Sequence, residues 1–250
     1  MRWADAFSQV PQVALLSMSP ADVAPPDRPQ RLTRATVLAA ALRLVDAEGL
    51  DALTRRRLGL ELGRDAMALY RYAPDRGALL DGIVELVLDE LAVPVEGQDW
   101  RTQLRRGAHD FRRLALAHPH VVGLLVTRPL ATPLGRRPLG TLQPLEHLLA
   151  LLVRSGFDAP AALGVYRLYV GILYGHVLTE LQELVTNPEE SDDLLRLGLH
   201  RLPAHDFPVL RGLASELAHY DGAAELDHAL DVLFAGLSAA PGGPTGEPGA

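Results

Sequence analysis

Between Thr54 and Arg76 the chain carries arginine, tyrosine and threonine side chains at spacings that suit contact with a polyanion. Guanidinium, phenol and hydroxyl groups donate hydrogen bonds to phosphate oxygens, and the backbone N–H groups at a helix N-terminus also attract an anion. Tyr70, Tyr72 and Arg76 are therefore expected to contact the backbone of a nucleic acid. Arg34, further upstream, is expected to reach the flanking backbone.

Small side chains lie between the arginines and the tyrosines. Ala66 and Ala68 fall at the start of a short predicted helix, where a bulky side chain would hold the backbone away from the major groove. Arg56 or Arg64 could pair with a guanine edge, and Ala68 with a thymine methyl group. The residues that we expect to contact DNA are Arg34, Thr54, Arg55, Arg56, Arg64, Ala66, Met67, Ala68, Tyr70, Arg71, Tyr72 and Arg76.

These residues also have a purely structural interpretation. An arginine-rich helix face, such as the run Arg55-Arg56-Arg57, is usually only solvated. A tyrosine on a short helix, such as Tyr70, packs against its neighbours as often as it binds a phosphate. DNA binding is the favoured interpretation because a threonine cap, an arginine cluster, a glycine turn and paired tyrosines occur together at consistent spacing.

Three predicted helices position this segment, over residues 33–49, 54–63 and 65–72. A threonine precedes the first two as N-cap and a glycine ends each of them, while Pro74 stops the third. The second and third helices with the turn at Gly63 fit a helix-turn-helix. The remaining helices are predicted over 75–91, 99–117, 121–127, 141–155, 160–185, 209–219 and 223–237, which makes the fold class all-α.

The composition excludes several classes of protein. The 250-residue chain has no cysteine, which rules out disulfides and thiolate metal sites. Its net charge of −7 argues against unselective coating of nucleic acid, although residues 28–80 hold ten arginines against six acids. The most apolar stretch, Leu168–Thr179, is shorter than the about 20 residues of a membrane span, and no secretory signal is evident. We expect a cytoplasmic protein with no membrane partner.

No arrangement of residues points to catalysis or to a metal. His118-Pro119-His120 lacks the spacing of a helical metal pair, and the chain has no glycine-rich phosphate loop, zinc-protease motif or nucleophile elbow. We therefore expect no metal, no cofactor and no enzymatic activity. An all-α enzyme and a helical interaction module without DNA binding remain the alternatives.

The motif positions resemble those of the TetR family of transcriptional regulators. The DNA-binding signature is matched by Leu53-Thr-Arg-Arg-Arg-Leu58, Leu62-Gly63, Met67-Ala-Leu-Tyr-Arg-Tyr72 and Pro74-Asp-Arg-Gly-Ala-Leu-Leu-Asp81. Trp100, Phe111, Thr127-Arg128-Pro129, Gly156-Phe157 and Gly175-His-Val-Leu178 are spaced as in the tetracycline-repressor subgroup. The resemblance covers about residues 32–238.

This resemblance implies a homodimer, paired through its last two long helices, that binds a near-palindromic operator in double-stranded DNA. A small-molecule effector would release this repressor from the operator. The implied organisation is a disordered leader over 1–30, a helix-turn-helix DNA-binding domain over 31–92, a C-terminal helical ligand-binding and dimerisation domain over 99–238, and a disordered tail over 239–250.

The resemblance also implies an effector pocket, but not one for tetracycline with its magnesium ion. Leu124 and Thr179 stand where the repressors of that drug have a metal-binding imidazole and an orienting carboxylate, and Ala92 replaces a drug-contacting histidine. Because Leu124 cannot ligate a hard cation, we expect an apolar or aromatic organic effector. The residues expected to line its pocket are His109, Phe111, Leu124, Thr127, Arg128, His147, Tyr166 and Tyr169.

Overall fold

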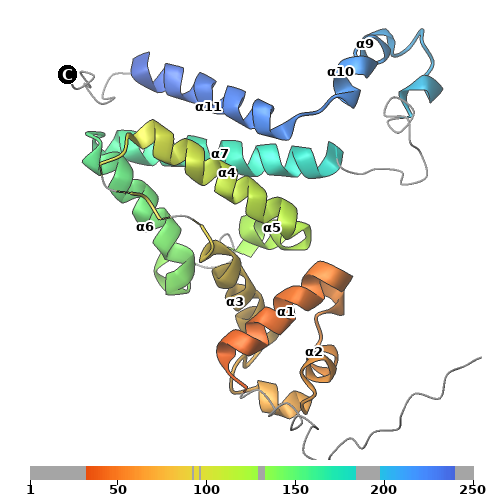
Figure 1. Cartoon of the computed structure of the whole chain (residues 1–250), viewed down its shortest axis with the longest axis vertical. Helices are drawn as coiled ribbons and strands as arrows, with labels where there is room; N and C mark the ends of the chain where they lie inside the picture. Colours follow the sequence, from red (N-terminus) through yellow and green to blue (C-terminus); the bar gives the residue numbers. More distant parts are fainter. Residues whose placement is uncertain (1–31, 92, 96, 129–132, 184–197, 240–250) are drawn as a thin grey trace, which may run out of the picture. The chain divides into compact units, whose positions relative to one another are not determined.

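The computed structural model describes residues 32–91, 93–95, 97–128, 133–183 and 198–239 (Figure 1). Every regular element in these ranges is a helix, so the prediction of an all-helical fold is confirmed. Contacts within the chain group residues 33–250 as one unit, which includes the helices predicted for both domains. The predicted leader lies outside the described residues, as does the predicted tail beyond residue 239.

The N-terminal helices form in the order that the sequence predicts. They are α1 (Arg34–Glu48), the 3-10 helix η1 (Leu50–Ala52), α2 (Arg55–Leu62), the 3-10 helix η2 (Ala66–Leu69) and α3 (Arg76–Leu88). The later helices are α4 (Trp100–Ala117), α5 (Pro119–Thr127), η4 (Leu134–Arg136), α6 (Leu139–Arg154), α7 (Ala159–Glu183), η5 (Leu199–Arg201), α9 (Pro208–Gly212), α10 (Ala214–Ala218) and α11 (Gly222–Ala239).

Side-chain caps fix the starts of the N-terminal helices. The Thr33 hydroxyl accepts from the N–H of Thr36 at 3.1 Å, and the Thr36 hydroxyl accepts from the N–H of Thr33 at 2.9 Å. Thr54 and Asp75 accept in the same way from the N–H three residues on, at 3.2 and 2.7 Å. Each cap satisfies an N–H that has no partner within its helix, which explains why these helices begin where they do.

Some helices differ from the predicted bounds. The third element is a short 3-10 helix, η2, rather than an α-helix over 65–72, and α3 ends at Leu88 rather than at residue 91. Helix α6 begins before Thr141, because the backbone already turns at Pro138, whose carbonyl accepts from the Thr141 hydroxyl at 2.8 Å. The single helix predicted over 209–219 is divided in two after Gly212, a residue with low helix propensity.

The C-terminal helices pack around α7, which contacts α4, α5, α6 and α11 (Figure 1). At the start of α4, the ring of Trp100 meets Phe157 and Phe234 edge-on, with centroid distances of 5.2 and 5.5 Å. Leu226 and Leu230 of α11 are fully buried. These apolar contacts join helices that are far apart in the sequence.

Helix α7 is long and apolar enough to cross a membrane by length and composition alone, with a mean hydropathy of 1.3 over Ala159–Leu181. The sequence analysis counted only the uncharged run between Arg167 and Glu180 and therefore found a shorter stretch. In the structure α7 packs on other helices on one side, and the helix leaves Leu168 and Leu178 57% and 41% exposed. Core helices of soluble proteins pass the same test of length and composition.

Candidate functional site

The surface around η2 exposes the small side chains that the sequence predicts to face DNA. Met67 is 71% exposed and Ala68 is exposed, whereas Leu69 is only 2% exposed. Asp65 caps the turn by accepting from the N–H of Met67 at 2.7 Å. A buried leucine thus anchors η2 while its other side chains remain accessible, and Ala66 is half-buried beside them.

Helix α2 and η2 approach each other so closely at Gly59 that no side chain fits there. A Cβ atom at this position would lie 2.8 Å from the carbonyl oxygen of Arg64, a backbone atom that cannot move aside. The N–H of Arg64 in turn donates to the carbonyl of Gly59 at 2.9 Å. The turn was predicted at Gly63, which is left-handed with φ +60°, whereas the requirement for Gly59 was not predicted. An isolated glycine inside a predicted helix was the available signal.

Arg55 holds Tyr70 in place rather than standing free for DNA. Its guanidinium donates to the Tyr70 hydroxyl at 2.8 Å and to the carbonyl of Pro74 at 2.6 Å. The same guanidinium lies 4.0 Å from the centre of the Tyr70 ring. Tyr70 remains 43% exposed, so its ring and hydroxyl are fixed in direction while still reaching solvent.

Two further predicted contact residues are engaged with the protein. Arg34 donates to Glu85 of α3 at 2.6 Å, and Arg76 donates to the carbonyl of Leu50 at 2.9 Å. Both arginines are exposed. They brace α3 against the preceding elements, which leaves them fewer N–H donors for a phosphate.

The third arginine of the run after Thr54 is tied to carboxylates. Arg57 pairs with Glu48 at 2.5 Å and with Glu61 at 3.3 Å. The hydrogen bond to Glu48 is the main cause that raises the pKa of Arg57. Arg57, which the sequence analysis left out of its contact set, is thus balanced by two acids.

Arg56 and Arg71 differ from these arginines. Both are exposed, and neither makes a hydrogen bond or an ion pair within the described residues. Arg64 is also exposed, Tyr72 is half-buried, and the Thr54 hydroxyl is occupied as the cap of α2. The predicted contact residues therefore divide into braced and accessible side chains.

Ion pairs join α5 to the N-terminal helices. His118, just before α5, lies 2.9 Å from the carboxylate of Asp46 in α1. At the other end of α5, Arg128 pairs with Asp81 of α3 and donates to the carbonyl of Gly77 at 3.2 Å. Arg128 was expected in the effector pocket, but the structure places it at this junction between α5 and α3.

A cavity of about 450 Å³ lies among α3, α4, α5, α6, α7 and the segment before α4. Its apolar wall includes Val84, Leu88, Leu104, Phe111, Leu125, Leu148, Leu151, Val170 and Leu173. Its polar wall includes Asp89, Gln103, Arg106, Arg137, Thr141, Gln143, His147, Tyr166, Tyr169 and Tyr174. A mostly apolar cavity with a few polar groups is the usual form of a small-molecule site.

Two of the tyrosines in this wall use their hydroxyl groups within the fold. Tyr169 donates to the carbonyl of Leu104 at 2.7 Å, and Tyr174 donates to the carbonyl of Leu125 at 3.3 Å. Burial raises the pKa of both phenols, so both are neutral donors at neutral pH. They shape the wall and offer a ligand their ring faces.

Gln103 of α4 fastens the segment that precedes this helix. Its side-chain carbonyl accepts from the N–H of Val95 at 2.8 Å, and its amide group donates to the carbonyl of Gln98 at 2.8 Å. Val95 itself lines the cavity. The sequence analysis did not single out Gln103, because its partners lie in a segment without regular structure.

The structure separates the residues expected to bind the effector into two groups. Those that line the cavity are Phe111, His147, Tyr166 and Tyr169. Those that lie outside its wall are His109, Leu124, Thr127 and Arg128. Leu124 is only 8% exposed, and the Thr127 hydroxyl donates to the carbonyl of Gly123 at 2.7 Å within α5.

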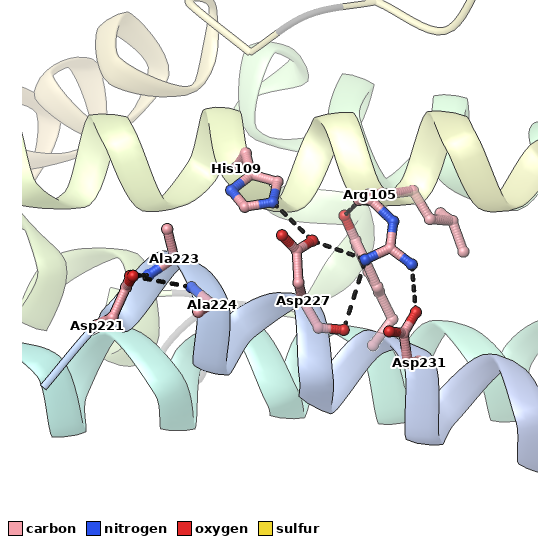
Figure 2. A network of polar contacts seen from close by, with 9 residues as sticks. Arg105, His109, Asp221, Ala223, Ala224, Asp227 and Asp231 are labelled. Carbon is pink, nitrogen blue, oxygen red and sulfur yellow. Dashed lines mark hydrogen bonds and ion pairs between the residues drawn. The ribbon is translucent and has the colours of Figure 1, made fainter. Parts of the chain in front are cut away.

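His109 faces α11 instead of the cavity (Figure 2). Its Nε2 lies 2.9 Å from Asp227, to which Arg105 donates at 2.7 Å, and Arg105 also reaches Asp231 at 2.5 Å. The hydrogen bond to His109, followed by the one to Arg105, lowers the pKa of Asp227. Bonds to Asp227 and Asp231 raise the pKa of Arg105. This cluster ties α4 to α11.

A buried ion pair joins α4 to α7. Arg112 donates to Glu180 at 2.8 and 2.5 Å, and Glu180 is 3% exposed. Gly222 packs directly on this carboxylate, since a Cβ at that position would lie 2.2 Å from it. Within the described residues there is no group of three histidines or acids that could hold a metal ion.

Comparisons with known proteins agree with this arrangement. The family model of the tetracyclin repressor-like C-terminal domain matches residues 93–240. The HTH-type transcriptional repressor DrrR1 of Streptomyces coeruleorubidus is 31% identical over 61% of this chain and 55% of its own length. The class D tetracycline repressor of Escherichia coli is 29% identical over 83% of this chain and 89% of its own.

Among solved structures, ActR of Streptomyces coelicolor in complex with actinorhodin superimposes with a TM-score of 0.65. It is 31% identical to this chain, and the alignment covers 84% of this chain and 98% of ActR.

The fold and the two sites define a ligand-responsive DNA-binding transcriptional regulator. The chain belongs to the TetR family, as the resemblance of its motifs predicted. Regulators of this family bind operator DNA and effectors, form dimers and are in general not enzymes.

Proposed function

We propose that this regulator is a cytoplasmic repressor that binds a near-palindromic operator as a homodimer and leaves it when an organic effector fills the cavity. The observation that carries the proposal is the exposed pair Met67 and Ala68 on a turn anchored by Leu69. An anchored element with an accessible alanine can bring its backbone close to the base pairs of a major groove.

Within this proposal, the accessible and the braced side chains have different roles. Arg56 and Arg71 are free to neutralise phosphates, and Arg56 or Arg64 reads a guanine edge while Ala68 contacts a thymine methyl group. Tyr70 donates to a phosphate in the orientation that Arg55 imposes. The remaining expected contacts, which position the turn on the DNA backbone, are Arg34, Thr54, Ala66, Met67, Tyr72 and Arg76.

The dimer is proposed to form through α7 and α11. Leu168 is 57% exposed and Val232 is 62% exposed, while Gly171 and Gly175 leave open space where side chains would stand. Apolar side chains beside glycines allow two helices to approach closely across a two-fold axis. Two-fold symmetry then places two η2 elements about 34–36 Å apart, one turn of DNA.

The cavity is proposed as the effector site. Its volume of about 450 Å³ suits a ring-containing organic molecule, and its wall is mostly apolar. ActR, which is similar over nearly its whole length, is described in complex with actinorhodin. Because Leu124 is buried away from the cavity wall and offers no ligand atom, magnesium-bound tetracycline is not the proposed effector.

A matched pair of arginine variants tests the DNA interface. Arg56→Ala is expected to weaken binding to the DNA upstream of the regulator's own coding sequence about tenfold and to reduce the salt slope by about 1. Arg57→Ala, which removes an arginine that two carboxylates already neutralise, is expected to leave the slope unchanged. Fluorescence anisotropy at several salt concentrations measures both. Equal slopes for Arg56→Ala and the parent protein would contradict the assigned contact.

The proposed dimer is tested with the same three proteins. Sedimentation analysis should give the mass of two chains for the parent protein and for both arginine variants. A protein that forms this dimer but binds no DNA from its own genome would instead be a helical interaction module.

A further inference from the structure

The polar groups of the cavity wall fall into those that the fold already uses and those that it leaves available. The hydroxyls of Tyr169 and Tyr174 and both ends of the Gln103 amide bond within the protein. The Thr141 hydroxyl likewise donates to a backbone carbonyl, at 2.8 Å. The three hydroxyls have therefore already used their only O–H donor and can offer a ligand only an acceptor, while the Gln103 amide keeps one N–H donor beyond its bond to Gln98.

Arg106 is the most prominent group that the fold leaves available. It lines the cavity from α4, is exposed, and makes no hydrogen bond or ion pair within the described residues. Its neighbours on the same helix are engaged differently: Arg105 pairs with Asp227 and Arg112 with Glu180. Carboxylates therefore pair with Arg105 and Arg112, whereas Arg106 on the cavity wall has no ion-pair partner within the described residues.

The charge balance of the wall is positive. Among the described residues of the wall, Arg106 and Arg137 are the two arginines and Asp89 is the single carboxylate. Asp89 forms no ion pair with Arg106 within the described residues, so it does not neutralise that arginine. Arg137 is half-buried, and its charge lowers the pKa of Tyr174 against the effect of burial. An anion entering this cavity gains charge-assisted hydrogen bonds that an uncharged molecule cannot make.

Two aromatic residues of the wall suit a flat ring system. Phe111 and Tyr174 lie with ring centroids 5.6 Å apart and their planes tilted by 56°. Aliphatic side chains such as Leu148 and Leu173 line the same cavity. Such a surface favours an aromatic body over a polar, flexible one.

From these features we propose that the effector is an organic anion, with a flat apolar body against Phe111 and Tyr174 and one acidic group held by Arg106 with the help of Arg137. This inference rests on the proposed function, because it assumes that the cavity is the effector site. The acidic group is a carboxylate or another oxyanion of similar size, for which a guanidinium is the best-matched partner.

Two fluorescent probes with the same ring framework test this proposal. Anilinonaphthalene sulfonate carries an acidic group, and N-phenyl-naphthylamine lacks it. The full-length dimer is expected to bind the sulfonate more tightly than the uncharged amine. Arg106→Gln should raise the Kd of the sulfonate about tenfold, which corresponds to about 1.4 kcal/mol, and change the Kd of the amine less than about twofold.

Three control variants separate the cavity from the rest of the surface. Arg113→Gln removes an exposed arginine of the same helix that lies outside the cavity wall, and it should leave both probes unaffected. Leu148→Trp fills the cavity and should abolish the binding of both probes. Arg106→Lys keeps the positive charge and should recover most of the affinity for the sulfonate. Thermal unfolding checks that each variant is folded.

The outcomes distinguish this proposal from the proposed function. If both probes bind in the cavity with equal affinity and Arg106→Gln changes neither, the effector is not an anion held by Arg106, although the cavity remains a ligand site. If Leu148→Trp changes neither probe, the cavity does not bind organic ligands, and both the effector assignment and this proposal are overturned.

Discussion

The DNA-contact surface and the ligand cavity are built in different ways. The surface is made by residues close together in the sequence. Asp65 caps η2, Gly59 leaves room for the backbone carbonyl of Arg64, and Arg55 holds Tyr70 in place. The cavity is enclosed by elements that span residues 84–174. Its helices are joined by contacts between distant residues, such as Arg112 with Glu180.

This difference separates what each region requires of its residues. A surface built from local contacts tolerates rearrangement elsewhere and depends on a few exact positions within it. A cavity built from distant contacts depends on the packing of whole helices, so one buried charge can affect it from outside its wall. Substitutions in each region therefore test whether the two are independent.

The largest expected loss of stability follows from breaking a contact between residues that are distant in the sequence. Arg112→Met leaves the buried carboxylate of Glu180 without its counter-charge and should lower the free energy of unfolding by about 3 kcal/mol. Urea unfolding measures this loss. The matched control, Arg113→Met, removes the neighbouring arginine, whose side chain is 57% exposed, and should change stability by less than about 0.5 kcal/mol. Equal losses of stability in the two variants would mean that Arg112 does not stabilise the buried carboxylate of Glu180.

A smaller effect is expected in the local contacts. Gly59→Ala places a Cβ against the Arg64 carbonyl and should lower the free energy of unfolding by about 2 kcal/mol. Because η2 must shift relative to α2, operator affinity should also fall by about tenfold or more. Gly123→Ala is the control: it lies in a helix with open space around it, and should raise stability by up to about 1 kcal/mol.

The glycine variant also tests the independence of the two regions. If the DNA-contact surface and the cavity are independent, the Gly59→Ala variant should bind N-phenyl-naphthylamine as tightly as the parent protein while its operator binding is lost. Loss of both in the folded variant would show that the two regions form one cooperative structure.

Within the cavity, two tyrosines sharpen the distinction between groups used by the fold and groups left available. Tyr169→Phe removes the hydrogen bond to the carbonyl of Leu104 and should lower the free energy of unfolding by about 1 kcal/mol. Tyr166 makes no hydrogen bond within the described residues, so Tyr166→Phe should leave stability unchanged. Thermal and urea unfolding of the pair provide the comparison, which fails if the two variants are equally stable.

The smallest effect concerns the ion cluster between α4 and α11. The pKa of Asp227 is lowered by His109 and Arg105, so this carboxylate stabilises the fold above its unfolded pKa of about 3.9. The stabilisation disappears as the pH falls through the lower pKa of the folded state. Since Asp227 is 43% exposed, Asp227→Asn should lower stability by only about 0.5 kcal/mol at pH 7. Urea unfolding should show the difference from the parent protein vanishing in acid; a constant difference would exclude this mechanism.

The local part of the DNA-contact surface could be predicted from the sequence because its signals are local. Thr33, Thr54 and Asp75 cap helices as their types and positions indicate, and the exposure of Ala68 follows from the short helix. What could not be predicted is which arginines are braced, because the partner of Arg34 lies 51 residues away.

The residues that line the cavity could be predicted only in part. The assignment of both His109 and Phe111 to its wall could have been avoided. His109 and Phe111 are two residues apart on α4 and so point about 200° away from each other, which prevents both from facing one cavity. Leu125 lines the cavity and Leu124 does not. Arg128 was assigned by resemblance, and its contact with Asp81 depends on a packing of α5 on α3 that no local pattern encodes.

The edge-on contacts of Trp100 with Phe157 and Phe234 provide the protein with its own optical reporter. The indole is 6% exposed and touches Phe157, in the turn between α6 and α7, as well as Phe234 of α11, so its emission should lie at short wavelength and shift when these helices move apart. The chain has one other tryptophan, Trp3, which a Trp3→Phe variant would silence. Helix movement on effector binding could then be followed without any attached dye.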